Sequence, residues 1–119
     1  MEWNTKEKFE EVCTSLIAKS AEAKNLYTSA LKNLNEGNID TFFEELKLAR
    51  QAWHDAGIIH MDIPKIEYNP WRIAEQQLLA HAEDNYANVE IFHNIATQQE
   101  QNYKAMNELR EEMNNKFNK

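Results

Sequence analysis

The stretch from residue 70 to residue 117, PWRIAEQQLLAHAEDNYANVEIFHNIATQQEQNYKAMNELREEMNNKF, decides the fold of this chain. After Pro70 it contains neither glycine nor proline, the residues most costly inside a helix. Its apolar residues recur at steps of three and four, the period of one helix face: Leu78, Ala82, Val89, Phe92, Ala96, Tyr103, Met106, Leu109, Met113 and Phe117. We predict one helix over 70–117, about 65 Å long. Because two shorter helices cannot cover it, its excess should pack in an oligomer or lie exposed.

Two shorter helices are predicted before it. The first covers about 5–36, with Asn4 or Thr5 as its cap, and ends at Gly37, which adopts a left-handed backbone without strain. The second covers about 39–62 and ends before Pro64. Because the link between them is short, the second helix should run back antiparallel to the first.

The loop DIPKIEYNP connects the second helix to the third. Its last two residues, Asn69 and Pro70, predict the restart of the helix, because asparagine caps free amides and proline tolerates the first helical position. Tyr68, Pro70 and Trp71 are expected to pack this loop.

Length and composition place these helices in one unit. A chain of 119 residues is long enough for one domain, residues 1–119, and it has only two glycines and two prolines. Residues that favour helices dominate the rest. The predicted class is all-α, a three-helix antiparallel bundle with a long third helix.

The charge and the apolar pattern limit the partners and the compartment. A net charge of −7 disfavours nucleic acid and suits a partner with a basic face, although solubility alone explains such a charge equally well. No run of about 20 apolar residues predicts membrane insertion, and the first residues lack the pattern of a secretory signal. We expect a cytoplasmic protein. Cys13 is the single cysteine and should be a small buried side chain.

The segment LLAHAEDNYANVE, residues 78–90, interrupts the apolar pattern with polar residues. His81, Asp84, Asn85 and Asn88 fall along one side of the predicted helix. Burying them without partners would cost several kcal/mol, so they require each other, a metal, another chain or water. One interpretation is a polar layer that sets the register of an oligomeric bundle. Another is a reactive histidine.

A metal site is a third interpretation of this region. Glu90 and His93 have the i, i+3 spacing of the Glu-x-x-His pair in di-iron helical bundles. Such sites require a second pair and two further glutamates on facing helices, and no second pair occurs in the sequence.

Three separated segments resemble the lactose/cellobiose-type enzyme IIA of the bacterial sugar phosphotransferase system. LIAKSAEAKNLYTSALKNLNEGNID is similar to its first helix and turn, and FFEELKLARQAWHDAGIIH is similar to its second helix. LLAHAEDNYA resembles its phosphorylation motif, L-x-x-H-A-Q-D-H-L-M. The similarity covers about residues 16–62 and 76–110, in the same order and spacing.

This resemblance implies a cytoplasmic phosphotransferase component that assembles as a homotrimer. The motif histidine, here His81, would accept a phosphoryl group from HPr and pass it to a cysteine of enzyme IIB, during uptake of lactose- or cellobiose-class sugars through a membrane enzyme IIC. The motif aspartate, here Asp84, would meet its copies at the trimer axis and hold Mg²⁺ or another divalent cation. A histidine that titrates near 6.5 has a neutral imidazole available as a nucleophile, and phosphoryl transfer requires mainly positioning and charge stabilisation.

The sequence departs from the family motif at several positions. Glu83 replaces a glutamine, Asn85 replaces a histidine, and Trp53 stands where the second helix often carries another histidine. These changes leave open a second hypothesis, a regulatory or interaction protein that keeps the trimeric scaffold without transfer.

The other histidines have no predicted role in the chemistry. His54, His60 and His93 are expected to be surface or interface residues.

Overall fold

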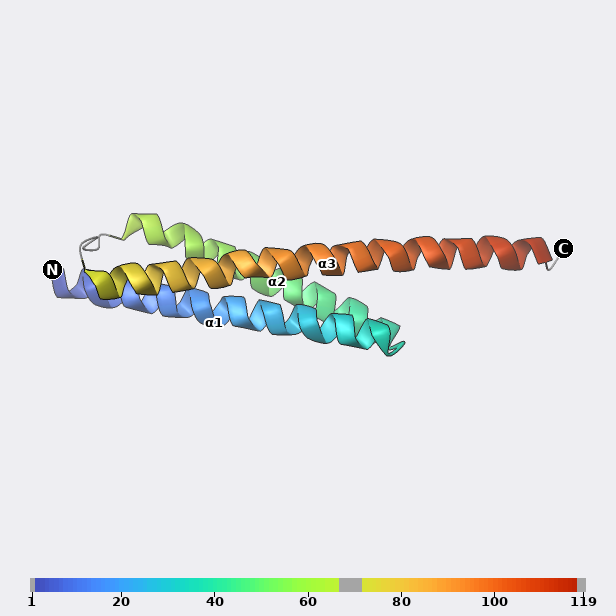
Figure 1. Cartoon of the computed structure of the whole chain (residues 1–119), viewed down its shortest axis with the longest axis horizontal. Coiled ribbons are helices and arrows are strands. Elements are labelled where there is room, and N and C mark those ends of the chain that lie inside the picture. Colours follow the sequence, from blue (N-terminus) through green and yellow to red (C-terminus); the bar gives the residue numbers. More distant parts are fainter. Residues whose placement is uncertain (1, 67–71, 118–119) are drawn as a thin grey trace.

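The computed structural model describes residues 2–66 and 72–117, and side chains from Lys6 onward within these ranges. It contains three long helices, α1 (Glu2–Asn35), α2 (Ile39–Asp62) and α3 (Ile73–Phe117), and a 3-10 turn, η1 (Ile63–Lys65) (Figure 1). No strand occurs in these two ranges, which confirms the predicted all-α class. None of the helices described is long and apolar enough to cross a membrane.

The turn between α1 and α2 forms at Gly37, as predicted. Gly37 has a φ of +82°, a left-handed backbone conformation that glycine adopts without steric cost. The Gly37 amide donates to the Leu34 carbonyl at 3.1 Å, and the Asn38 amide donates to the Asn33 carbonyl at 2.8 Å. This pair of bonds is a Schellman motif, which satisfies carbonyls at the end of α1. After this turn α2 runs back along α1 (Figure 1).

The connection from α2 to α3 begins as predicted. Helix α2 ends at Asp62, and Pro64 lies inside η1, where its missing N–H removes no helical bond. The predicted restart at Asn69 and Pro70, and the predicted packing of the loop by Tyr68, Pro70 and Trp71, lie outside the described residues. The described part of α3 begins at Ile73, and its Gln76 amide donates to the Arg72 carbonyl at 3.1 Å.

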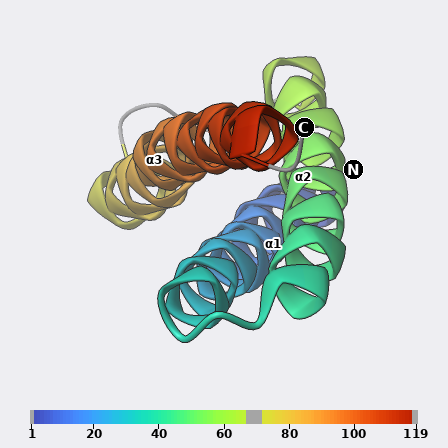
Figure 2. The same ribbon diagram turned by 90° about the vertical axis from the view of Figure 1, so that its right-hand side faces the viewer.

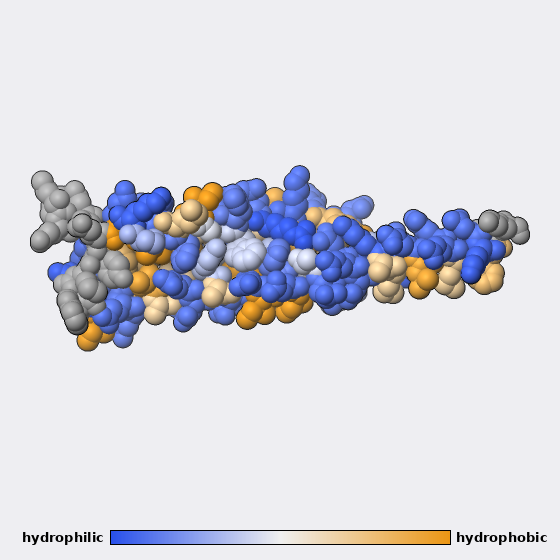
Figure 3. All heavy atoms as spheres, turned by 90° about the horizontal axis from the view of Figure 1, so that it is seen from above, coloured by the Kyte–Doolittle hydropathy of each residue, from blue (hydrophilic) through white to orange (hydrophobic). Residues whose placement is uncertain are grey.

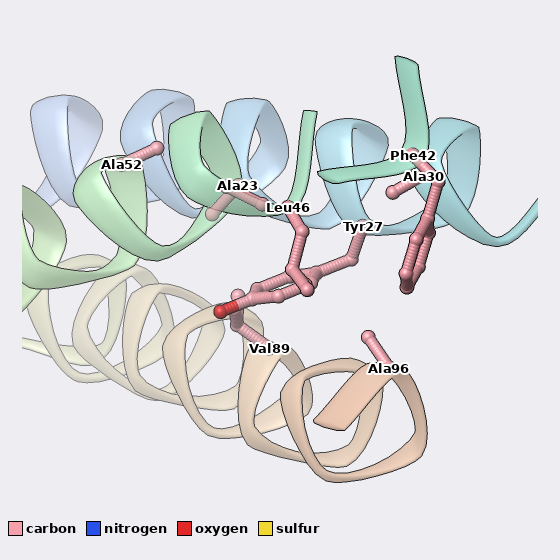
Figure 4. Close-up of a cluster of buried hydrophobic side chains, with 9 residues drawn as sticks. Ala23, Tyr27, Ala30, Phe42, Leu46, Ala52, Val89 and Ala96 are labelled. Atoms are coloured by element: carbon pink, nitrogen blue, oxygen red, sulfur yellow. The ribbon is translucent and has the colours of Figure 1, made fainter. Parts of the chain in front are cut away.

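Two clusters of buried side chains hold the three helices together. The upper cluster, which includes Tyr27, Phe42, Leu46 and Val89, lies near the α1–α2 turn, and many of its other members are alanines (Figure 4). The lower cluster lies toward the start of α1 and consists of Phe9, Cys13, Leu16, Ala56, Ile63 and Ala82. Small side chains at these contacts allow the helix axes to approach closely. The prediction that Cys13 is buried is confirmed, because its exposed fraction is 0%.

Helix α3 lies over the α1–α2 pair in its first part and then projects beyond it (Figures 1 and 2). The molecule is consequently elongated, with extents of 75 × 21 × 19 Å. From Lys104 to Phe117 every residue is exposed. The excess length of this helix therefore lies exposed in the single chain.

The single apolar repeat predicted along this helix is wrong, because the apolar residues divide between two faces. Ala82, Val89 and Ala96 are fully buried against α1 and α2, whereas Met106, 58% exposed, and Leu109, 57% exposed, face water. Successive residues turn by about 100°, so the line through Met106 runs back to Ile95 and not to Ala96. The predicted repeat combined residues of two neighbouring faces, because steps of three and four residues do not distinguish these faces.

Candidate functional site

The first third of α3 is anchored on one side, and this anchoring determines which side chains face outward. Ala82 is fully buried in the lower cluster, and Leu78, Leu79 and Tyr86 pack against that cluster. The motif residues between these anchors must therefore point away from the core. The structure places the two predicted site residues, His81 and Asp84, on this exposed side.

Asn85, one helical turn further along, is a polar neighbour of His81. The Asn85 side-chain amide donates to the backbone carbonyl of His81 at 2.8 Å. The same nitrogen lies 3.4 Å from Nδ1 and 3.5 Å from Nε2 of the imidazole, so the amide lies beside the ring. These longer contacts are at the limit of hydrogen bonding, and the bond to the carbonyl is the firm one. Asn85 therefore has a local role beside His81, which its i, i+4 spacing could have indicated.

Glu83 lies on a different side of the helix from His81. Two residues correspond to a rotation of about 200°, and side chains with this spacing do not face each other. Its charge instead acts toward α1: burial raises the pKa of the Cys13 thiol, and the negative charge of Glu83 raises that pKa further. The glutamate that departs from the family motif is therefore directed away from the imidazole.

Asp84 is exposed and lies three positions after His81, so the two side chains occupy neighbouring positions on the outer side of α3. In the described ranges of one chain, no group of three or more His, Cys, Asp or Glu side chains converges in a way that could hold a metal ion. Carboxylate oxygens are the ligands that Mg²⁺ prefers, and one chain supplies a single carboxylate at this position. A metal site at Asp84 would therefore require copies of the chain.

His60 and Tyr86 brace the end of α2 against α3 close to the motif. Their rings are stacked with centroids 4.7 Å apart and planes at 20°. Gly57, one turn before His60, provides the space for the Tyr86 hydroxyl, because a Cβ added at Gly57 would lie 3.1 Å from that oxygen. The backbone that carries His81 is thus held from both neighbouring helices.

His93 is more deeply placed than predicted. Its Nδ1 lies 2.8 Å from the hydroxyl oxygen of Tyr27, and its ring lies 4.6 Å, centroid to centroid, from the ring of Trp53. Burial raises the pKa of Tyr27 to about 12. Burial, reinforced by the positive charge of Arg50, lowers the pKa of His93. These directions favour a protonated phenol and a neutral imidazole, which share one hydrogen bond. His93 therefore contacts Tyr27 on α1 and Trp53 on α2, and it belongs to the packing of the bundle.

His54 is exposed on α2, as expected for a surface residue. An open pocket of about 470 Å³ lies further along the bundle and is lined by Phe43, Leu46, Lys47, Arg50, Gln51 and Glu100. Glu100 is 19 residues beyond His81 on the same helix, which corresponds to about 28 Å. The pocket is therefore separate from the motif.

Comparison with known protein families identifies the family of this chain. Residues 11–104 match the family described as "PTS system, Lactose/Cellobiose specific IIA subunit". The chain belongs to this family. No curated protein and no solved structure gave a significant match to the chain.

Membership of the IIA family makes the chain a component of a sugar phosphotransferase system. At the level of the family, this supports the general role of a phosphoryl carrier. The match includes His81 and Asp84 and ends at Lys104, where α3 leaves the bundle. The remainder of α3, residues 105–117, is an addition to the matched IIA segment.

Proposed function

We propose that His81 is the phosphoryl acceptor of this IIA subunit. It receives the group from HPr and passes it to a cysteine of enzyme IIB during uptake of sugars of the lactose and cellobiose class. The observation that carries the proposal is the exposed position of His81 inside the segment that matches the IIA family. An exposed imidazole is accessible in turn to two partner proteins, which a buried one is not.

The transfer is a pair of displacements at phosphorus. In the first, one imidazole nitrogen of His81 forms a bond to phosphorus while the bond to the donor in HPr breaks. In the second, a thiolate of enzyme IIB forms the new bond and the imidazole leaves. Covalent catalysis of this kind divides one transfer into two easier ones, and the protein contributes mainly positioning. The anchors on α1 and α2 and the contact with Asn85 support that positioning.

The acceptor lies beside a seam that suits association with other copies. We define the outer seam as the exposed residues of α3 that recur in steps of three, four and four: Asp84, Ala87, Ile91, Ile95, Gln98, Asn102, Met106, Leu109, Met113 and Phe117. Ile91 is 57% exposed and Ile95 is 46% exposed, although both are strongly apolar. Burial of such residues between subunits is favourable. This supports the homotrimer that the family resemblance implies.

In a parallel trimer on this seam, Asp84 of each copy meets the other two. Three carboxylates close together repel one another, and a divalent cation such as Mg²⁺, a hard ion that prefers oxygen ligands, would neutralise them. The set of donors fits the ion only in the assembled state. Calorimetry with and without magnesium tests this: the melting temperature of the wild type should rise with the ion, and that of Asp84→Asn should not.

The carrier role is tested by phosphorylation followed by intact-mass analysis. The chain is incubated with enzyme I, HPr and phosphoenolpyruvate, and the same experiment is done with His81→Ala and with His54→Ala. His54 is the matched control, because it is also an exposed histidine. We expect one acid-labile phosphate per chain on the wild type and on His54→Ala, and none on His81→Ala. An unmodified wild type in the presence of active HPr would instead favour the trimeric scaffold without transfer, the role suggested by the altered motif.

A further inference from the structure

The final segment of α3, residues 105–117, is exposed throughout, and no contact with the other residues that the structure describes explains its apolar side chains. The last ring contacts with the bundle are those of Tyr103, 5.9 Å from the Phe43 ring, and of the Lys104 ammonium, 5.9 Å from the same ring. From residue 105 onward, about 20 Å of helix lies beyond them. A helix of this length gains little stability from propensity alone and normally requires packing of an apolar face.

This segment has such an apolar face, and it is exposed. Met106, Leu109, Met113 and Phe117 are 58%, 57%, 49% and 81% exposed. The apolar side chains line one edge of the projecting end of the molecule, and hydrophilic residues cover much of the remainder (Figure 3). An apolar stripe along a helix indicates a partner that covers it.

The repeat of the outer seam indicates what that partner is. Asp84, Ile95, Met106 and Phe117 are each 11 residues apart, so the apolar edge of the final segment continues the seam of the bundle without a change of phase. An 11-residue repeat corresponds to about 3.67 residues per turn, which favours straight or slightly right-handed packing of parallel helices. Helix α3 is correspondingly straight where it projects (Figure 1).

The polar residues of the seam favour a parallel copy of the same helix. Gln98 donates from Nε2 to Oδ1 of Asn102 at 3.1 Å, and amides carry both donors and acceptors that can also bond to identical amides. A parallel copy in register places Asn102 against Asn102 and Met106 against Met106. An antiparallel copy that pairs the final segments about Leu109 would place Asn102 at the level of Lys116, next to Phe117. Buried amides favour the register in which they meet each other.

The charge of the segment also suits association with itself. Residues 105–117 carry two basic residues (Arg110 and Lys116) and three acidic ones (Glu108, Glu111 and Glu112), a net charge of −1, whereas the whole chain has a net charge of −7. Copies of this segment therefore repel one another only weakly. The absence of a basic excess disfavours an anionic lipid surface as the partner.

We infer that residues 105–117 of three copies pack in parallel and in register, as a short stalk that extends the subunit interface beyond the segment that matches the IIA family. This inference rests on the homotrimer proposed above. The stalk adds buried apolar surface to the assembly at a distance from His81.

Cross-linking of variants of the full chain that carry one added cysteine tests the stalk. Met113→Cys places a thiol on the seam, and Glu111→Cys, two residues away, places one on the opposite side of the same helix as the matched control. Cys13 is fully buried, and the wild type controls for it. Mild oxidation under native conditions should convert a majority of Met113→Cys into disulfide-linked pairs, at a yield at least fivefold above that of Glu111→Cys.

Sedimentation of the same samples separates the failure of the stalk from the failure of the trimer. A trimer in which both variants cross-link equally poorly would overturn the stalk and leave the trimer standing. A monomer would overturn both. A second measurement is the sedimentation of Leu109→Asp over a range of protein concentrations. The trimer of this variant should dissociate at a concentration at least tenfold higher than the concentration at which the wild-type trimer dissociates. His81 should still be phosphorylated in this variant, because Leu109 lies about 40 Å along the helix from the motif.

Discussion

Replacement of Tyr27 by phenylalanine removes one hydroxyl from the centre of the bundle and should lower its stability measurably. The hydroxyl is 2.8 Å from His93 Nδ1, and Tyr27 is 0% exposed. Figure 4 shows Tyr27 extending from α1 toward Val89 on α3. A net hydrogen bond contributes about 1 kcal/mol, and an acceptor left without a partner in a buried site adds to the loss. Because His93 is only half-buried, we expect a total loss of about 1.5 kcal/mol.

Differential scanning calorimetry at fixed protein concentration measures this loss. The entropy of unfolding is about 2.1 cal/mol/K per residue, so a loss of about 1.5 kcal/mol corresponds to a decrease in Tm of about 6 °C for a chain of 119 residues. Protein concentration must be held constant because association contributes to Tm. Tyr103→Phe is the matched control, since Tyr103 makes an edge contact with Phe43 and should lose less than about 0.5 kcal/mol.

A double-mutant cycle identifies the cause. If the hydroxyl acts through His93, then Tyr27→Phe should cost less in a His93→Leu background, with a coupling energy of about 1 kcal/mol. Equal losses for Tyr27→Phe and Tyr103→Phe, or a cost of Tyr27→Phe that is unchanged by His93→Leu, would refute the assigned hydrogen bond.

Two further perturbations concern the same interface between α3 and its neighbours. The pKa of His93 is lowered in the folded state, whereas in the unfolded state it has its ordinary value near 6.5. As the pH falls, the unfolded state therefore binds a proton first. The free energy of unfolding should be at its full value above about pH 6.5 and should decrease below it. Urea unfolding at pH 7 and at pH 5.5 should show a larger decrease for the wild type than for His93→Gln, and parallel decreases would contradict this. At Gly57, alanine should add about 1 kcal/mol of helix propensity, offset by its contact with the Tyr86 hydroxyl at 3.1 Å. The full gain should appear only in a Tyr86→Phe background, and an equal gain in both backgrounds would show that the contact imposes no restriction.

Several local features of the fold could be read from the sequence. The end of α1 at Gly37 follows from the left-handed backbone that glycine permits, and the end of α2 before Pro64 follows from the steric effect of proline on the residue before it. The position of the segment LLAHAEDNYA on a helix follows from the repeat around it. Each of these depends on residues close together in the chain, which is why sequence patterns report them.

The environment of the candidate site depended on contacts between distant segments. Tyr27 and His93 are 66 residues apart, and no local pattern pairs them. Trp53 was recognised as a departure from the family, but its contact with the His93 ring appears only in the folded chain. The effect of Glu83 on the Cys13 thiol likewise joins residues 70 positions apart.

The sequence by itself determined that the chain is helical, where its helices end and which histidine belongs to the motif, because helix propensity, capping and motif spacing are local properties. Only the tertiary structure decided which apolar residues of α3 form the core and which form the outer seam. Successive residues of a helix are rotated by about 100°, so a step of three or four residues can stay on one face or cross to the neighbouring face. Contact with α1 and α2 buries Ala82, Val89 and Ala96 and leaves the line from Ile91 to Phe117 exposed for another chain.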